Sequence, residues 1–137
     1  MSESLAAPLA LLDWPYARFL GLEADVEGAA VVTRLPFRQA LVGNVMLPAV
    51  HGGVVAAFLE LTALAQLAHV APAGRTPKTV DATIDYLRAT RAKTTFGRAT
   101  IVRIGRRVAN LHVTAWQDDE TRPVATLRGH FELTSGG

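Results

Sequence analysis

The sequence has no cysteine, which excludes a disulfide framework, a thiolate metal site and a cysteine nucleophile. Its start also lacks the basic segment of a signal peptide, and together these absences favour a location in the cytoplasm. The sequence contains no phosphate-binding glycine loop and no GxGxxG, GxSxG or HExxH motif. Its histidines are not spaced as metal ligands, so we expect no metal site.

The chain does have enough apolar sequence to build a core. Half of its 137 residues are hydrophobic and 19% are charged, which predicts one domain over residues 1–137. The most apolar stretch, residues 52–70, is nearly long enough to span a bilayer, but Glu60 and Gln66 interrupt it. We therefore expect this stretch to be a buried helix of a soluble domain.

The net charge of +2 is unevenly distributed. No aspartate or glutamate occurs from Tyr86 to Gln117. The same stretch holds half of the basic residues, namely Arg88, Arg91, Lys93, Arg98, Arg103, Arg106 and Arg107. Such a local field suggests an anionic ligand, although the solvated surface of ordinary strands explains it equally well.

The first half of the chain reads as helix, strands and a second helix. Residues 1–20 form an N-terminal helical segment, followed by two strands at 22–28 and 29–35. A loop with proline and glycine is expected at 36–51, ahead of the long helix at about 52–70.

After this helix the apolar period changes to two. The segment TVDATIDYL places Val80, Ala82, Ile84 and Tyr86 on one face, and Thr79, Asp81, Thr83 and Asp85 on the other. Three further strands at 98–104, 107–117 and 123–133 are joined by short turns, so we expect antiparallel neighbours. One principal helix on one antiparallel sheet is an α+β layer.

The long helix is apolar on nearly every side, from Val54 to Ala68. Such a helix is buried all round, and one sheet can cover only one of its sides. We therefore predict that a second subunit covers the rest and that the protein is an obligate dimer.

The start of the long helix carries His51, Gly52 and Gly53. Glycines allow a tight turn, which is one explanation of the motif, and they also allow a ligand to approach closely. The first N–H groups of a helix lack internal partners and can stabilise a carbonyl oxygen that becomes an oxyanion. We expect His51 to anchor the loop, with Asn44 as its partner or as a second polar contact for the carbonyl.

Glu60 is the only acid inside this apolar helix. Burying a carboxylate without partners is costly, so Glu60 serves either a structural pairing or a reaction. Gly52 and Glu60 are eight residues apart, or about 12 Å along a helix, which is too far for both to contact one small group. If they act together, Gly52 of one chain must meet Glu60 of another across a two-fold axis.

Four segments together resemble the PaaI-type hotdog-fold acyl-CoA thioesterases, namely HGGVVAAFLE, TVDATIDYLR, GRRVANLHV and VATLRGHFEL. The resemblance covers roughly residues 15–134. It implies a curved antiparallel sheet of about five to six strands around a long central helix. It also implies homodimers that often pair into tetramers, an active site at the dimer interface, and no cofactor beyond the coenzyme A of the substrate.

The resemblance further implies roles for single residues. Gly52 would polarise the thioester carbonyl through its N–H, and Glu60 would act as nucleophile or as general base. Thr79 falls where relatives have a Ser or Thr that helps to place water. Asn44 lies near the family's loop Asn or Gln, seven residues before His51 where some relatives have six. Leu64 stands where some relatives that carry Glu have a Thr.

Relatives bind the nucleotide of coenzyme A with residues at strand ends and hairpins. The corresponding candidates here can meet phosphates bidentately, and they are Arg88, Arg91, Arg106 and Arg107. The candidates for an acyl pocket suggest a medium-chain or aromatic acyl group, and they are Phe58, Leu61 and Leu64.

Two rival functions share this fold. Acyl-thioester dehydratases and hydratases need a histidine in the loop ahead of the helix, and here none precedes His51. A non-catalytic acyl-CoA-binding protein is the other rival, because fold does not guarantee activity. Nucleic acid and membrane are not expected partners, since the basic stretch has neither interleaved aromatic residues nor a recognition motif.

Overall fold

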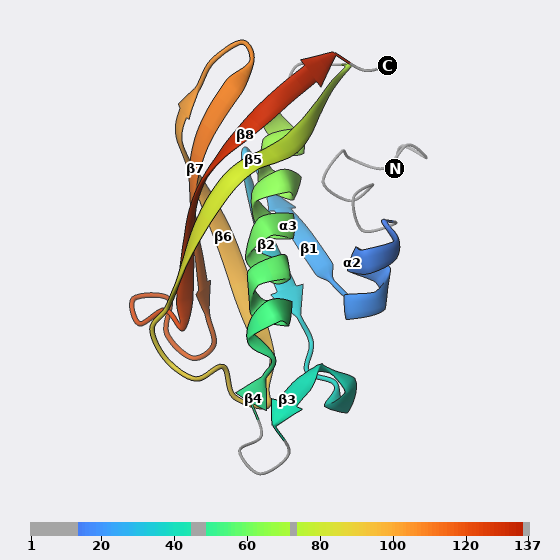
Figure 1. The fold of residues 1–137 in the computed structure, drawn as a ribbon, viewed down its shortest axis with the longest axis vertical. Coiled ribbons are helices and arrows are strands. Elements are labelled where there is room, and N and C mark those ends of the chain that lie inside the picture. The colour runs from blue at the N-terminus through green and yellow to red at the C-terminus, as the bar shows by residue number, and fades with distance from the viewer. Residues whose placement is uncertain (1–13, 45–48, 72–73, 136–137) are drawn as a thin grey trace.

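A long helix, α3 (Gly52–Val70), runs along one face of a six-stranded antiparallel sheet that curves around it (Figure 1). The computed structural model describes residues 14–44, 49–71 and 74–135. The strand order is β1-β2-β6-β7-β8-β5, which leaves β1 and β5 at the two edges of the sheet. The α+β hotdog fold predicted from the sequence is confirmed.

The large sheet combines a short hairpin with four longer strands. The hairpin is β1 (Glu23–Glu27) and β2 (Ala30–Leu35), and Gly28 turns between them with a φ of 64°. The longer strands are β5 (Arg75–Tyr86), β6 (Thr95–Ile104), β7 (Val108–Trp116) and β8 (Ala125–Ser135). Strands were thus predicted at the right places, although β5 and β6 begin a few residues earlier than expected.

The N-terminal part is only partly described. Helix α2 (Pro15–Leu20) ends at Gly21, whose φ of 74° is the left-handed conformation that glycine adopts readily at a helix end. Residues 1–13 of the predicted N-terminal helical segment lie outside the described residues.

The prediction of a plain loop at 36–51 was wrong in its details. The segment contains a 3₁₀ turn (Gln39–Leu41) and two short strands, β3 (Val42–Asn44) and β4 (Ala49–Val50), which pair antiparallel. Strands of two or three residues are too short to leave an apolar period in the sequence. They tie the chain to the helix start, where His51 N–H donates to Leu41 O at 2.8 Å.

The core lies between α3 and the inner face of the sheet. Phe58, Leu59 and Leu67 of the helix have no exposed surface, and alternate apolar residues of β7 and β8 are buried with them, including Leu111, Val113, Leu127 and Phe131. Burial of each large apolar side chain contributes about 1.5–3 kcal/mol to stability. Although α3 is long and apolar enough to cross a membrane, it packs as the core helix of the domain, as predicted.

Polar contacts fasten the same helix to β2. Thr62 Oγ1 lies 2.7 Å from Thr33 Oγ1, and both side chains are fully buried. Gln66 accepts a hydrogen bond from Val31 N–H at 2.9 Å and donates to Ala29 O at 2.8 Å. Gln66, which interrupts the apolar stretch of the sequence, therefore satisfies backbone groups of the β1–β2 hairpin.

Strand β5 contains a bulge that the sequence pattern did not predict. Thr79 pairs with Phe131 and Asp81 with His130, so the residue between Thr79 and Asp81 has no partner in β8. A bulge of one residue reverses the alternation on one side of it. The predicted faces of β5 are therefore wrong for Thr79, which shares the helix-facing side with Ala82 and not the outer side with Asp81.

Candidate active site

The start of α3 presents a backbone N–H that has no partner among the described residues. His51 is the N-cap residue, and its Nδ1 accepts a hydrogen bond from Gly53 N–H at 2.9 Å. Because Nδ1 accepts, the proton of the neutral ring is on Nε2. Gly52 occupies the first helical position, and its N–H donates to no described residue. Its N–H is therefore free to bind a carbonyl oxygen at the positive end of the helix.

Glu60 lies near the middle of α3, half-buried, and its partner is a side chain of β5. Thr79 Oγ1 donates to Glu60 Oε2 at 2.6 Å, a short distance for a hydroxyl that donates to a carboxylate. Among the described residues, no basic side chain forms an ion pair with Glu60. The structure therefore does not pair this carboxylate with a cation, and it leaves Oε1 without a described donor.

Strand β5 contacts the helix a second time at its other end. Tyr86 Oη donates to Gly52 O at 2.9 Å, and the Tyr86 side chain is 56% exposed. The same two residues line a cavity of about 400 Å³, whose other lining residues include Val55, Arg88 and Thr90. A cavity thus opens beside Gly52, whose N–H is the candidate donor to a carbonyl oxygen.

A second cavity, of about 460 Å³, adjoins the first through Arg88 and Ala89. Three arginines line it, Arg88, Arg91 and Arg122, together with Asp118 and Asp119. Arg88 is held there by a hydrogen bond from Nη1 to Pro123 O at 2.5 Å. One cavity thus lies at the helix start and its neighbour beside three guanidinium groups, with Arg88 and Ala89 in the lining of both.

Acidic residues just beyond the basic stretch partly cancel its charge. Asp118 pairs with Arg91 and Lys93, and Glu120 pairs with Arg98. The Lys93 ammonium, with Arg91, holds the pKa of Asp118 below its usual range. The positive electrostatic field predicted for residues 86–117 is therefore weaker than the sequence suggests. Among the candidates for binding phosphate, Arg88 forms no ion pair with a described residue.

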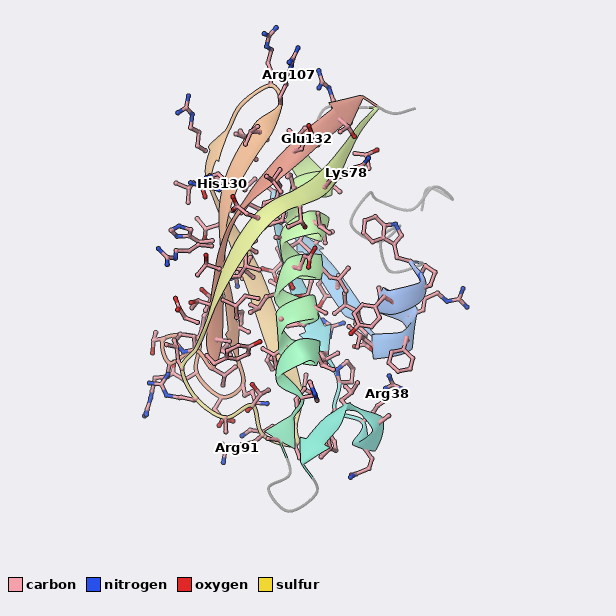
Figure 2. All side chains as sticks on the ribbon, in the orientation of Figure 1. Arg38, Lys78, Arg91, Arg107, His130 and Glu132 are labelled. Atoms are coloured by element: carbon pink, nitrogen blue, oxygen red, sulfur yellow. The ribbon has the colours of Figure 1, made fainter. Side chains whose placement is uncertain are left out.

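The four predicted arginines do not come together within one chain. Arg88 N–H donates to Val124 O, whereas Arg107 O accepts from Leu133 N–H, at the other end of β8. Figure 2 shows Arg91 and Arg107 at opposite ends of the molecule. Val124 and Leu133 are nine residues apart, or about 30 Å along a strand. Arg106 and Arg107 therefore lie far from Arg88 and Arg91.

The remaining predicted site residues are placed as follows. Asn44 ends strand β3. Phe58 is fully buried, and its ring lies 2.9 Å from where a Cβ on Gly97 would stand. Leu61 and Leu64 are 8% and 5% exposed. All three apolar candidates belong to the core of the single chain, and Phe58 has no surface there for a ligand.

Residues 47–124, which include the helix start, Glu60, Thr79 and the arginine cavity, match the family model of the thioesterase superfamily. The chain belongs to the thioesterase superfamily. The resemblance to the PaaI-type hotdog-fold thioesterases is thereby confirmed at the level of superfamily and fold. No curated protein matches the chain significantly.

Solved structures of similar fold come from several bacteria. A protein from Chromobacterium violaceum is 35% identical, with 94% of this chain and 90% of that chain covered and a TM-score of 0.75. A phenylacetic acid degradation-related protein from Ralstonia eutropha is 24% identical, with 93% and 99% covered and a TM-score of 0.78. PaaI of Escherichia coli is 18% identical, with 96% and 92% covered and a TM-score of 0.81. The last two similarities are evidence of a shared fold.

Two residues of this superfamily member were missed as candidates in the sequence. Tyr86 was read only as part of an apolar row, because a pattern of period two does not reveal what a hydroxyl contacts. Arg122 lies five residues beyond Gln117, outside the acid-free stretch, and reaches the arginine cavity through the β7–β8 connection. The sequence feature that could have identified Arg122 is its position just before Pro123 and Val124, in a turn that leads the chain back to the sheet.

Proposed function

We propose that the protein hydrolyses an acyl-CoA thioester to the free acid and coenzyme A. The observation that supports this most is the hydrogen bond from Thr79 to Glu60 in a chain of the thioesterase superfamily. Within the described part of the chain, one hydroxyl and no cation holds this carboxylate, so one of its oxygens is kept for chemistry, whereas a structural ion pair would occupy it.

The proposed reaction uses the helix start and the acid together. The Gly52 N–H and the helix dipole stabilise negative charge as it develops on the thioester oxygen. Glu60 either attacks the carbonyl carbon directly or takes a proton from a water molecule that attacks it. The C–S bond then breaks, and coenzyme A leaves as the thiol: in the general-base route it receives the proton that Glu60 took from water, and in the direct route a proton from solvent. In the direct route the acyl group stays on Glu60 as a mixed anhydride, which a water molecule then hydrolyses to the free acid and the carboxylate. Thr79 holds one carboxylate oxygen and so directs the other to the substrate.

The distance between the two groups requires two chains. Along α3, Gly52 and Glu60 are separated by eight residues, or about 12 Å. Strand β5 is the surface where a second chain would join, because it is an edge strand of 12 residues and its Val80 is 60% exposed. Long exposed edges with apolar side chains favour strand pairing. We propose that two β5 strands pair antiparallel across a two-fold axis.

The contacts of β5 select one register for this pairing. Tyr86 marks the Gly52 half of a site and Thr79 marks the Glu60 half, so Tyr86 of one strand should lie opposite Thr79 of the other. Opposite residues of antiparallel strands share a face, and the bulge contributes one extra residue. If the two-fold axis passes through Thr83, this residue lies opposite its own copy. Counting outward from it and skipping the bulged residue, Tyr86 then lies opposite Thr79 on the same face.

The cavities support a coenzyme A ester as the form of the thioester. The cavity at Gly52 would take a pantetheine arm, and the adjoining cavity, lined by Arg88, Arg91 and Arg122, would supply cations for phosphates. In the proposed dimer, the start of the second β5 points toward the same end. The Arg106 and Arg107 candidates of the second subunit would then approach the nucleotide, with no cofactor beyond the substrate's own coenzyme A.

The acyl group is the part of the substrate that the chain specifies least. The acyl pocket predicted from the sequence suggests a medium-chain or aromatic acyl group, but its Phe58 is fully buried in the single chain. Two structural neighbours are named for phenylacetic acid degradation, which favours an aromatic group. Aryl-acetyl-CoA esters are therefore the first substrates to test. A dimer or dimer of dimers in the cytoplasm stays a prediction.

The experiment is a hydrolysis screen over short, medium, long and aryl acyl-CoA esters, with release of free thiol as the readout. Glu60→Gln keeps the shape of the side chain, so it should abolish turnover and leave binding of the ester intact. Near-normal hydrolysis by this variant would refute the mechanism. Enoyl product from a 3-hydroxyacyl thioester would favour a dehydratase, and an ester bound tightly without turnover would favour a binding protein.

A further inference from the structure

The peptide unit between Gly52 and Gly53 is held at both ends by side chains. Tyr86 Oη donates to the Gly52 carbonyl at 2.9 Å, and the Gly53 N–H donates to His51 Nδ1 at 2.9 Å. Glycine has more accessible backbone conformations than any other residue, so two glycines in succession leave a helix start free to move. The two side-chain contacts restrict this freedom where the free N–H of Gly52 is presented.

Tyr86 makes its contact from a different element of the fold. It is the last residue of β5, opposite Ala125 of β8, and it faces α3. A Cβ added to Gly52 would stand 3.7 Å from Cε1, Cζ and Oη of the ring, which is ordinary van der Waals distance. The ring therefore packs over Gly52 while its hydroxyl binds the carbonyl of the same residue.

We propose that Tyr86 is a positioning residue that holds the Gly52 N–H in the direction of the thioester oxygen, an inference that rests on the proposed function. Fixing the Gly52 carbonyl fixes ψ of that residue and keeps the first turn helical. The Gly52 N–H belongs to the preceding peptide unit, whose His51 carbonyl accepts hydrogen bonds from the Val54 and Val55 N–H groups. With the peptide units on both sides of the Gly52 Cα held, this N–H stays aligned with the helix axis before substrate binds. A donor that is already oriented stabilises the transition state without reorganisation.

A purely structural role predicts a different outcome. As one hydrogen bond from a half-exposed side chain, the Tyr86 contact would contribute modestly to folding, and its loss would lower thermal stability without changing the chemical step. A positioning role predicts a lower kcat with little change in KM, because the interaction matters mainly in the transition state.

The test compares Tyr86→Phe with Tyr16→Phe. Both substitutions remove one phenol hydroxyl from a partly exposed tyrosine, but the Tyr16 hydroxyl bonds to no described residue and lies on α2. We expect Tyr86→Phe to lower kcat about tenfold with KM within about twofold, and Tyr16→Phe to change neither. An unchanged kcat in Tyr86→Phe, or a loss confined to KM or to thermal stability, overturns the proposal.

Amide hydrogen exchange of Gly53 supplies a readout that does not depend on activity. Loss of the Tyr86 contact should speed this exchange about tenfold in Tyr86→Phe and not in Tyr16→Phe. Unchanged exchange overturns the proposed positioning whatever the kinetics. A wild-type protein that hydrolyses none of the thioesters overturns the proposed function instead, and exchange then still decides whether Tyr86 holds this peptide.

Discussion

Thr79 Oγ1 donates a hydrogen bond to Glu60 Oε2 at 2.6 Å, which joins the centre of α3 to strand β5 next to its bulge. The bulge is what turns Thr79 toward the helix. Among the described residues, this hydroxyl is the hydrogen-bond partner of the Glu60 side chain, so the orientation of the carboxylate depends on it.

The first prediction concerns that hydroxyl. Thr79→Val keeps the shape of the side chain but removes the donor, so kcat should fall about 10- to 100-fold. Thr79→Ser keeps the donor and should retain most of the activity. Steady-state kinetics with one acyl-CoA ester measure both variants. Equal activities of the two variants would show that the hydroxyl has no role in catalysis.

The second prediction isolates the N–H of Gly52. Proline is favoured at the first helical position, and His51 before it has the extended conformation that proline requires, with φ −57° and ψ 136°. Gly52→Pro should therefore fold while it lacks the donor, and kcat should fall about 10²- to 10³-fold. Gly52→Ala keeps the N–H, and its Cβ would meet Tyr86 only at 3.7 Å.

The measurement is kcat for both Gly52 variants, with circular dichroism as the check on folding. The alanine variant should lose much less activity than the proline variant. A folded Gly52→Pro protein with wild-type kcat would exclude this N–H from the reaction.

The third prediction concerns the register of the dimer. The chain has no cysteine, so Thr83→Cys introduces the only thiol. If the two-fold axis passes through Thr83, the two Cα atoms lie about 4.5–5.5 Å apart, within the range of a disulfide. Mild oxidation should then give a covalent dimer on a non-reducing gel.

Thr100→Cys is the matched control, because Thr100 is also exposed but lies on β6, within the sheet. It should stay monomeric on the same gel. Cross-linking of both variants to the same extent, or of neither, would contradict the proposed register.

The fourth prediction concerns the arginine cavity. Replacing Arg88 and Arg122 by Gln removes two cations from the proposed phosphate site, so KM for acyl-CoA esters should rise about tenfold. The KM for the same acyl group on pantetheine, which lacks the nucleotide, should not change. Arg18→Gln on α2 serves as the control for loss of charge. An equal rise for both thioesters would remove the cavity as the nucleotide site.

The fold was predictable because its signals are periodic or local. The apolar run of α3, the alternation in β7 and β8, and glycines at Gly21 and Gly28 each have one main structural meaning. The short strands β3 and β4 were missed because two or three residues do not establish a period.

The site was predictable only in part. An acid in an apolar helix and two glycines at its start identified Glu60 and Gly52 as candidates. The contact of Thr79 with Glu60 depends on a bulge, which the alternation of apolar and polar residues could not reveal, since it predicts the opposite face for Thr79. The pairing of Arg91 and Arg98 with Asp118 and Glu120 also depends on tertiary structure.

The central claim is that each active site combines Gly52 of one subunit with Glu60 of the other. Subunit complementation tests it most directly, by co-expressing a Glu60→Gln chain with a Gly52→Pro chain under two affinity tags and purifying the hybrid dimer. Each hybrid should contain one intact site and one site with both substitutions, and so should recover about half of wild-type activity while each parent dimer is nearly inactive. A hybrid as inactive as its parents would contradict the claim.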